Sequence, residues 1–357
     1  ARNRVSYNQG GGNLQQYSGW GASANISYDF GGMVLTSITA YEGVEGFSRG
    51  DIDGGVAGVG PGFIPFDSDT QDTLGGLDQH SQEIRLASDT NEPLSWQVGA
   101  YWFDGEFDVT TVGPSGFPPA VTLTHDNTAW ALFGQGTYAF NDQFSVTAGV
   151  RYTEDNKTLR VIGQPANARD VSDEHVSWDL SAMYDVTDDF SVYARVAEGF
   201  RGTSIQGRDV AFFNPPSVAD SETVLSWEAG FKSSLLDNTL RLNAAAFTYE
   251  VSDIQLTAVG GGGNLVQLVN ANSGEAVGFE VDAEWAPLDN LVFTAGYSYV
   301  DSEIKDSALA VGICAQCTIT DPTTVINGQT RALVNGNPFP NAPESIARKD
   351  IIPLMRK

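Results

Sequence analysis

The two cysteines, Cys314 and Cys317, form the most recognisable chemical spacing in this sequence. A Cys-x-x-Cys pair occurs in redox sites and as half of a zinc site, but no second Cys/His pair accompanies it here and no βαβ pattern surrounds it. A small disulfide within a loop fits this context better and would suit an oxidising compartment. We therefore expect a Cys314–Cys317 disulfide, with no metal and no cofactor.

Catalytic patterns are missing from the sequence. The three histidines, His80, His125 and His175, lie far apart, and no set of serine, histidine and carboxylate stands out from the loop composition. Neither GxxxxGK[ST] nor HExxH occurs. The acidic stretch at 66–72 offers oxygen ligands but lacks the spacing of an EF-hand loop. We expect a protein that is not an enzyme.

Arg195, Arg201, Arg208 and Trp102 are the candidates for binding a small ligand. The planar guanidinium fork suits carboxylate or phosphate groups, and an aromatic ring at a rim can stack on a sugar or a catecholate. In the commoner alternative, the arginines simply pair with acids of the same surface, such as Asp179. Ligand binding requires strands that bring these residues into one lumen, or into loops near its outer end.

Alternating apolar and polar residues predict such strands. In the stretch 143–154, Phe144, Val146 and Val150 share one face, while Gln143 and Thr147 share the other. No run of roughly 18 apolar residues occurs, which excludes helical membrane spans but leaves transmembrane strands of about ten residues. One face of each strand suits lipid and the other suits a wet lumen, so the pattern predicts an all-β fold, a transmembrane antiparallel β-barrel.

About twelve strands are expected, and short and long connections alternate between them. We place them at 19–30, 33–42, 79–88, 94–106, 127–140, 143–154, 175–186, 190–201, 222–232, 239–257, 264–286 and 291–304. Outer-membrane barrels have short periplasmic turns and long extracellular loops. The long connections are therefore expected to face outside.

Three regions follow from this pattern. Residues 1–18 form a loop or N-terminal edge, and 19–304 form the barrel domain. The alternation fails in 305–357, which we predict to be a long loop and an irregular tail whose sequence becomes non-native near Arg348, through truncation or a changed reading frame.

The charge of the chain limits its partners. Nineteen basic residues against 45 acidic ones give a net charge of −26. Nucleic acid is therefore not an expected partner, since phosphates require a basic surface. An acidic surface could instead hold divalent cations near anionic lipid or select cationic cargo, although solvated acidic faces are commoner.

Several segments resemble one family. They are HSQEIRLAS from His80, WQVGAYWF from Trp96, SVYARVAEGFRGTSIQGR from Ser191 and NANSGEAVGFEVDAEWAPLDNLVFTAGYSYVDS from Asn270. Their order and spacing are similar to the β-barrel domain of TonB-dependent outer-membrane receptors, energised importers of iron chelates, vitamins and some saccharides.

The resemblance implies a function and a set of partners. It implies a fragment carrying about twelve of the family's roughly 22 strands, in an open rather than a closed barrel. It places the chain in the outer membrane of a Gram-negative bacterium, in TonB-dependent uptake of a scarce nutrient, most simply an iron–siderophore complex. The implied partners are outer-membrane lipid and lipopolysaccharide, the TonB complex and the small-molecule nutrient.

Two other architectures remain open at this point. A self-contained twelve-strand barrel, acting as a passive pore or a surface enzyme, requires the first and last strands to pair. A soluble adhesin or lectin-like sandwich requires an apolar core between two sheets, and an outward-facing apolar belt would exclude it.

Overall fold

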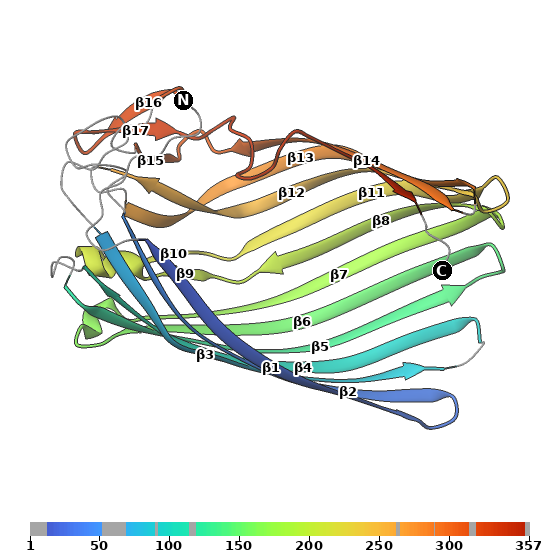
Figure 1. Cartoon of the computed structure of the whole chain (residues 1–357), viewed down its shortest axis with the longest axis horizontal. Coiled ribbons are helices and arrows are strands. Elements are labelled where there is room, and N and C mark those ends of the chain that lie inside the picture. Colours follow the sequence, from blue (N-terminus) through green and yellow to red (C-terminus); the bar gives the residue numbers. More distant parts are fainter. Residues whose placement is uncertain are drawn as a thin grey trace.

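The computed structural model describes residues 13–51, 69–89, 92–113, 119–261, 265–288, 290–313 and 319–353. Within them one curved antiparallel sheet of 13 strands dominates (Figure 1), in the order β1-β2-β3-β4-β5-β6-β7-β8-β11-β12-β13-β14-β18. Its strands are β1 (Leu14–Asp29), β2 (Met33–Asp51), β3 (Asp69–Ser88), β4 (Leu94–Val112), β5 (Val121–Ala139), β6 (Phe144–Val161), β7 (Arg169–Thr187), β8 (Phe190–Arg201), β11 (Glu222–Leu235), β12 (Leu240–Gly260), β13 (Leu265–Leu288), β14 (Leu291–Lys305) and β18 (Ser345–Pro353). The predicted all-β fold and the twelve predicted strands are confirmed.

Several strands extend further toward the long loops than alternation predicted. β3 begins at Asp69 rather than near residue 79, and β5 begins at Val121 rather than near 127. Residues 69–73 of β3 are polar on both faces and have no hydrophobic period, whereas the start of β5 alternates Val121 and Leu123 with threonines. Both segments continue the hydrogen-bonded pairing of the sheet. For β3, pairing with neighbours rather than side-chain pattern determines where the strand begins.

The apolar face of the sheet is exposed. On β7, Val176, Leu180 and Tyr184 are 49%, 45% and 43% exposed, whereas the alternate Ser177 and Asp179 are more covered. An interior core between two sheets would bury these apolar side chains instead. The observed face is the apolar belt of a transmembrane wall, and the soluble sandwich is excluded.

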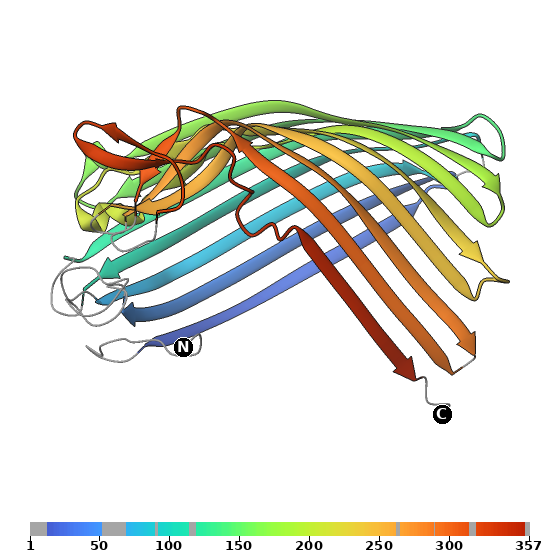
Figure 2. The same cartoon turned by 90° about the horizontal axis from the view of Figure 1, so that it is seen from above.

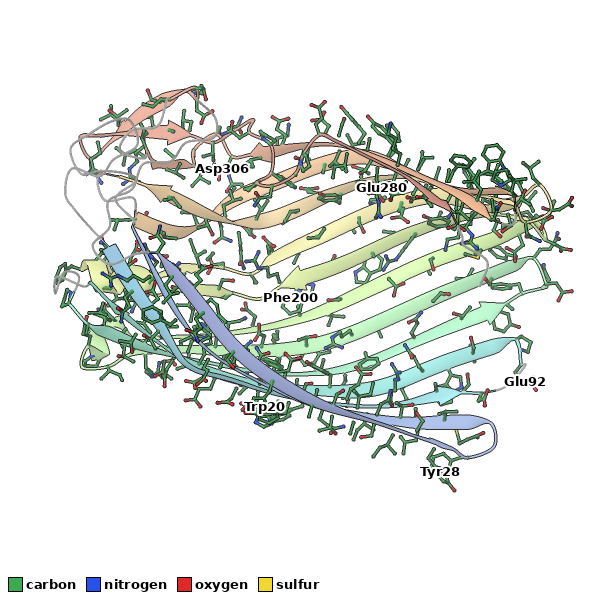
Figure 3. All side chains as sticks on the ribbon, in the orientation of Figure 1. Trp20, Tyr28, Glu92, Phe200, Glu280 and Asp306 are labelled. Atoms are coloured by element: carbon green, nitrogen blue, oxygen red, sulfur yellow. The ribbon has the colours of Figure 1, made fainter. Side chains whose placement is uncertain are left out.

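Aromatic rings cluster on the sheet beside the short turns, as the interfacial girdle of a membrane barrel requires. The ring pairs at this end are Tyr28 with Phe30, Tyr138 with Phe140, Phe190 with Phe231, and Trp285 with Phe293. Figure 3 shows Tyr28 near the first hairpin turn and Asp306 at the opposite end of the sheet, beside the long connections.

The sheet is open. Among the described residues β1 pairs with β2 and β18 pairs with β14, and Figure 2 shows these two strands at the separate edges of an arch. A self-contained barrel needs its first and last strands to pair, so this alternative is not supported by the structure.

The segment after residue 305 is more regular than predicted. β18 pairs with β14 from Tyr299↔Ser345 to Leu291↔Pro353. A small sheet in the order β15-β17-β16 precedes it, formed by β15 (Ala310–Gly312), β16 (Thr323–Ile326) and β17 (Gln329–Leu333). The prediction of an irregular tail was wrong here, because the unpaired backbone groups at the edge of β14 can bind a segment whose sequence lacks alternation. That this sequence is non-native stays a prediction.

Short elements cover the polar face at the outer end. β9 (Ser204–Gln206), the 3-10 helix η2 (Arg208–Phe212) and β10 (Ser217–Ala219) lie in residues 202–221, which we call the inner shelf. Val210 and Ala211 of the shelf pack on Leu123 and Leu159 of the wall. Another 3-10 helix, η1 (Pro165–Asn167), joins β6 to β7. None of the described helices is long and apolar enough to cross a membrane.

Candidate functional site

A polar groove crosses the inner face of the wall. Hydrogen-bonded neighbours place Gln97, Gln135, Gly149, Asp179 and Ala197 in one row from β4 to β8. The groove has a volume of about 470 Å³. A Cβ at Gly149 would collide with Oδ1 of Asp179, so glycine is what allows this carboxylate to lie across β6.

Arg151 is the best-positioned cation of this groove. Its guanidinium carbon lies 5.5 Å from the ring centre of Tyr101 and 5.6 Å from that of Phe133. Its Nε donates to Oγ1 of Thr153 at 3.1 Å. Within the described residues Arg151 has no ion pair, so two aromatic rings orient a guanidinium whose terminal N–H groups remain available to an anion.

Arg195, a predicted ligand residue, lines the same groove. Its Nε lies 3.8 Å from Oδ2 of Asp179, and its side chain is 51% exposed. This is the pairing that the sequence left open as the commoner alternative. An exposed pair at this distance contributes little stability, so a ligand carboxylate can compete with Asp179 for the guanidinium.

Arg201 and Arg208 lie nearer the outer end, at the inner shelf. Nη1 of Arg201 lies 3.5 Å from Oε1 of Glu222. Nη1 of Arg208 lies 2.9 Å from Oδ1 of Asp209, and its guanidinium carbon lies 5.0 Å from the ring centre of Phe212. Both arginines are therefore paired, yet each uses only part of its donor set.

The carboxylate of Asp209 is buried under the shelf. Asp209 is 4% exposed, and its Oδ2 accepts the backbone N–H of Val266 at 2.6 Å. Burial raises the pKa of the Asp209 carboxyl, while the Val266 N–H and the Arg208 guanidinium act in the opposite direction. The charge of Arg208 is thus compensated in place, which fixes the position of its side chain.

Trp102 lies on the other face. It pairs across β4 and β5 with Trp130, shares its face with Val98 and Leu132, and is 47% exposed. Because side chains alternate along a strand, this face is the apolar one. The expectation that Trp102 belongs to the lumen or the loops was therefore wrong, and a direct role in ligand binding stays a prediction without support from its position.

The remaining residues considered from the sequence are the two cysteines and the three histidines. Cys314 and Cys317 lie outside the described residues. His80, His125 and His175 lie on β3, β5 and β7, three strands that do not pair with one another in the described sheet. No group of three or more His, Cys, Asp or Glu among the described residues could hold a metal ion.

Two important residues were not among the predicted ones. Gln255 of β12 contacts the inner shelf through several hydrogen bonds, and Arg151 contacts Tyr101 and Phe133. The position of Arg151 on the polar face was readable from alternation, but its aromatic neighbours lie on other strands. No local pattern marks Gln255, because its partners lie 35 to 53 residues away in the sequence.

Known proteins share this architecture. The ferric yersiniabactin uptake receptor FyuA from Yersinia pestis superposes with a TM-score of 0.73 and 19% identity, over 97% of this chain and 48% of that protein. The siderophore receptor PiuA from Acinetobacter baumannii gives a TM-score of 0.68 and 13% identity, over 94% and 52%. At these identities the similarity shows the fold.

Sequence relatives point to the same group. The pesticin receptor of Yersinia pestis is 30% identical over 191 residues, which are 52% of this chain and 26% of that protein. The pesticin receptor of Yersinia enterocolitica is 27% identical over 239 residues, 65% of this chain and 31% of that protein. The chain thus spans less than a third of these curated relatives. The family model for the TonB-dependent receptor-like β-barrel matches residues 1–351. This chain therefore belongs to the TonB-dependent receptors, as part of their β-barrel, and is a protein of the Gram-negative outer membrane.

Proposed function

We propose that the receptor containing this wall takes up an iron–siderophore complex across the outer membrane, with energy supplied through the TonB complex. Relatives named for siderophores support the cargo class: FyuA is a ferric yersiniabactin receptor and PiuA a siderophore receptor. Lipopolysaccharide of the outer leaflet is the further partner that we propose. We assign no enzymatic activity, in keeping with a family of receptors and transporters.

The inner groove is the observation that carries this proposal. Arg151 and Arg195 lie on the lumen side, one oriented by two rings and the other only loosely paired to Asp179. An iron chelate presents carboxylate or phenolate oxygens, and a guanidinium fork beside aromatic rings suits such groups. A passive pore for small cations would gain nothing from these two arginines.

Uptake measured in cells tests the proposal. We expect disruption of the gene to abolish accumulation of radioactive iron from one of a panel of ferric siderophores, with vitamin and saccharide uptake measured alongside. Restoring the gene with R151A and R195A together should lower the apparent affinity about tenfold or more, because hydrogen bonds to charged groups contribute roughly 1.5–3 kcal/mol each.

Arg241 provides a matched control for the two arginines of the groove. Arg241 also faces the lumen, lies 4.0 Å from Glu284 and is outside the groove, so R241A should leave the affinity unchanged. Unchanged iron uptake after gene disruption, with loss of vitamin or saccharide uptake instead, would refute the iron–siderophore assignment.

A further inference from the structure

We infer that Gln255 is a positioning residue for ligand binding, because it holds the inner shelf in place on the lumen face. The inference rests on the proposed function for its transport readout. Its structural basis is independent of the cargo, since it depends only on contacts between the shelf and the wall.

The side chain of Gln255 satisfies three groups of the shelf. Its Nε2 donates to the carbonyl oxygens of Gly202 and Asp220, each at 2.9 Å. Its Oε1 accepts the hydroxyl of Ser204 at 2.7 Å. Gln255 is only 8% exposed. A single buried amide therefore joins both ends of the shelf to β12. Removing it would take the donor from the buried Gly202 carbonyl and the acceptor from the Ser204 hydroxyl, while the Asp220 carbonyl would keep Nδ2 of Asn270 as a donor at 2.9 Å.

Two carboxylates repeat one arrangement beside this amide. Glu222 accepts the backbone N–H of Gln255 at 2.5 Å and pairs with Arg201. Asp209 accepts the backbone N–H of Val266 and pairs with Arg208. In both cases a carboxylate joins one arginine to a backbone N–H of the wall. The two guanidiniums are thereby held at a constant separation, which an independently moving loop could not achieve.

Apolar packing seats the middle of the shelf. Leu159 of β6 is 2% exposed under Val210 and Ala211. A Cβ at Gly207 would lie 3.0 Å from Leu159, so the shelf backbone approaches the wall closely. This packing does not involve Gln255. Loss of the amide should therefore loosen the shelf at Gly202 and Ser204, while Asn270 still holds Asp220 and the sheet beneath stays folded.

The consequence for binding is preorganisation. A shelf held in place keeps Arg208 beside Arg201 of β8, so both guanidiniums meet the anionic oxygens of a ligand without an ordering cost at the moment of binding. A loosened shelf has to be ordered when the ligand binds, so the affinity falls while the later steps of transport are unaffected. The substrate class this arrangement fits is an anionic chelate large enough to reach two arginines.

The test compares Q255L with Q97L in the protein as purified from outer membranes. Gln97 also lies on the inner face, but its Nε2 makes one long contact of 3.5 Å with Gln135. By hydrogen exchange, Q255L should reduce the protection of Ile205 and Val218, which pair in the shelf, about thirtyfold, the effect of losing roughly two hydrogen bonds. Protection of β6 and β7 should not change, and Q97L should not alter the shelf.

Uptake kinetics separate positioning from a general structural role. We expect Q255L to raise the ligand concentration for half-maximal uptake about tenfold or more with an unchanged maximal rate. Unchanged shelf protection in Q255L would overturn the inference even if iron uptake is established. Reduced protection with unchanged half-maximal concentration would overturn the role in binding. If Q255L fails to assemble, Q255N, which is one methylene shorter, carries the same test.

Discussion

Replacing Asp306 should open the outer end of the wall between β13 and β14. Asp306 is 6% exposed, and its carboxylate accepts three backbone N–H groups: Asn272 at 3.0 Å, Ala308 at 2.9 Å and Leu309 at 2.8 Å. Hydrogen bonds to charged groups contribute roughly 1.5–3 kcal/mol each, against the cost of burying the charge. We expect D306A to lower the free energy of local opening by about 3 kcal/mol, or roughly 150-fold in the opening equilibrium.

Hydrogen exchange read out by mass spectrometry measures this opening directly. Amides of Asn272, Ala308 and Leu309 should lose protection in D306A, while β6 and β7 keep theirs. D301A is the matched control, because Asp301 is an exposed carboxylate on β14, the strand that ends at Lys305 directly before Asp306. Equal protection at Ala308 and Leu309 in D306A and D301A would refute the reasoning.

The same carboxylate predicts a pH dependence with a defined sign. Burial alone would raise the pKa of the Asp306 carboxyl, but the three backbone N–H donors hold it below its usual value. A lowered pKa in the folded state means that the stabilisation is complete above the unfolded value, near pH ~4, and is lost as pH falls through the folded pKa. Protection at Leu309 should therefore be constant from neutral pH to about pH 5 and decrease below it, and D306A should remove this dependence.

Two further predictions concern the wall itself. G278A should destabilise the protein by roughly 1–3 kcal/mol, because a Cβ there would collide with the backbone oxygen of Tyr299 and the ring of Phe247. G136A is its control, since the nearest atoms to a Cβ at that position lie 3.8 Å away, and equal urea midpoints for both variants would contradict the assigned register. W102A should weaken heat resistance of the membrane-inserted protein through loss of aromatic contact area, with ligand affinity unchanged. Reduced affinity in W102A at unchanged heat resistance would contradict the lipid-facing position of this side chain.

Much of the wall was predictable because alternation is a local property. The stretch 143–154 encodes its own two faces, and the same rule applied to Val98 and Ala100 would have assigned Trp102 to the apolar face. Its assignment to the lumen or the loops came instead from the ability of an aromatic ring to stack on a sugar or a catecholate. For Trp102, the alternation of apolar and polar residues predicts the correct face of the strand, and the residue type alone does not.

The site was less predictable because it depends on contacts between distant segments. Gln255 reaches Gly202 and Asp220 only after β8, β11 and β12 have paired. β18 was missed for a related reason, because the edge of β14, rather than a pattern in the sequence of β18, produces the pairing. The local pattern therefore predicts which segments form paired strands. The pairing of those strands then determines which polar side chains come into contact.

The open edges constrain how this wall can work in a membrane. β1 has 16 residues, and roughly half of its backbone N–H and C=O groups point away from β2, toward a side on which no strand pairs in the described sheet. Each such group costs several kcal/mol in hydrocarbon, so even half of this edge would cost tens of kcal/mol, more than the roughly 5–15 kcal/mol that stabilises a domain. The same holds for the free side of β18. We therefore expect further strands to continue the wall past both edges when it faces lipid, which fits its coverage of 48% of FyuA. The inner groove and the shelf occupy one side of that larger lumen, so their affinity for a ligand has to be measured in the closed assembly.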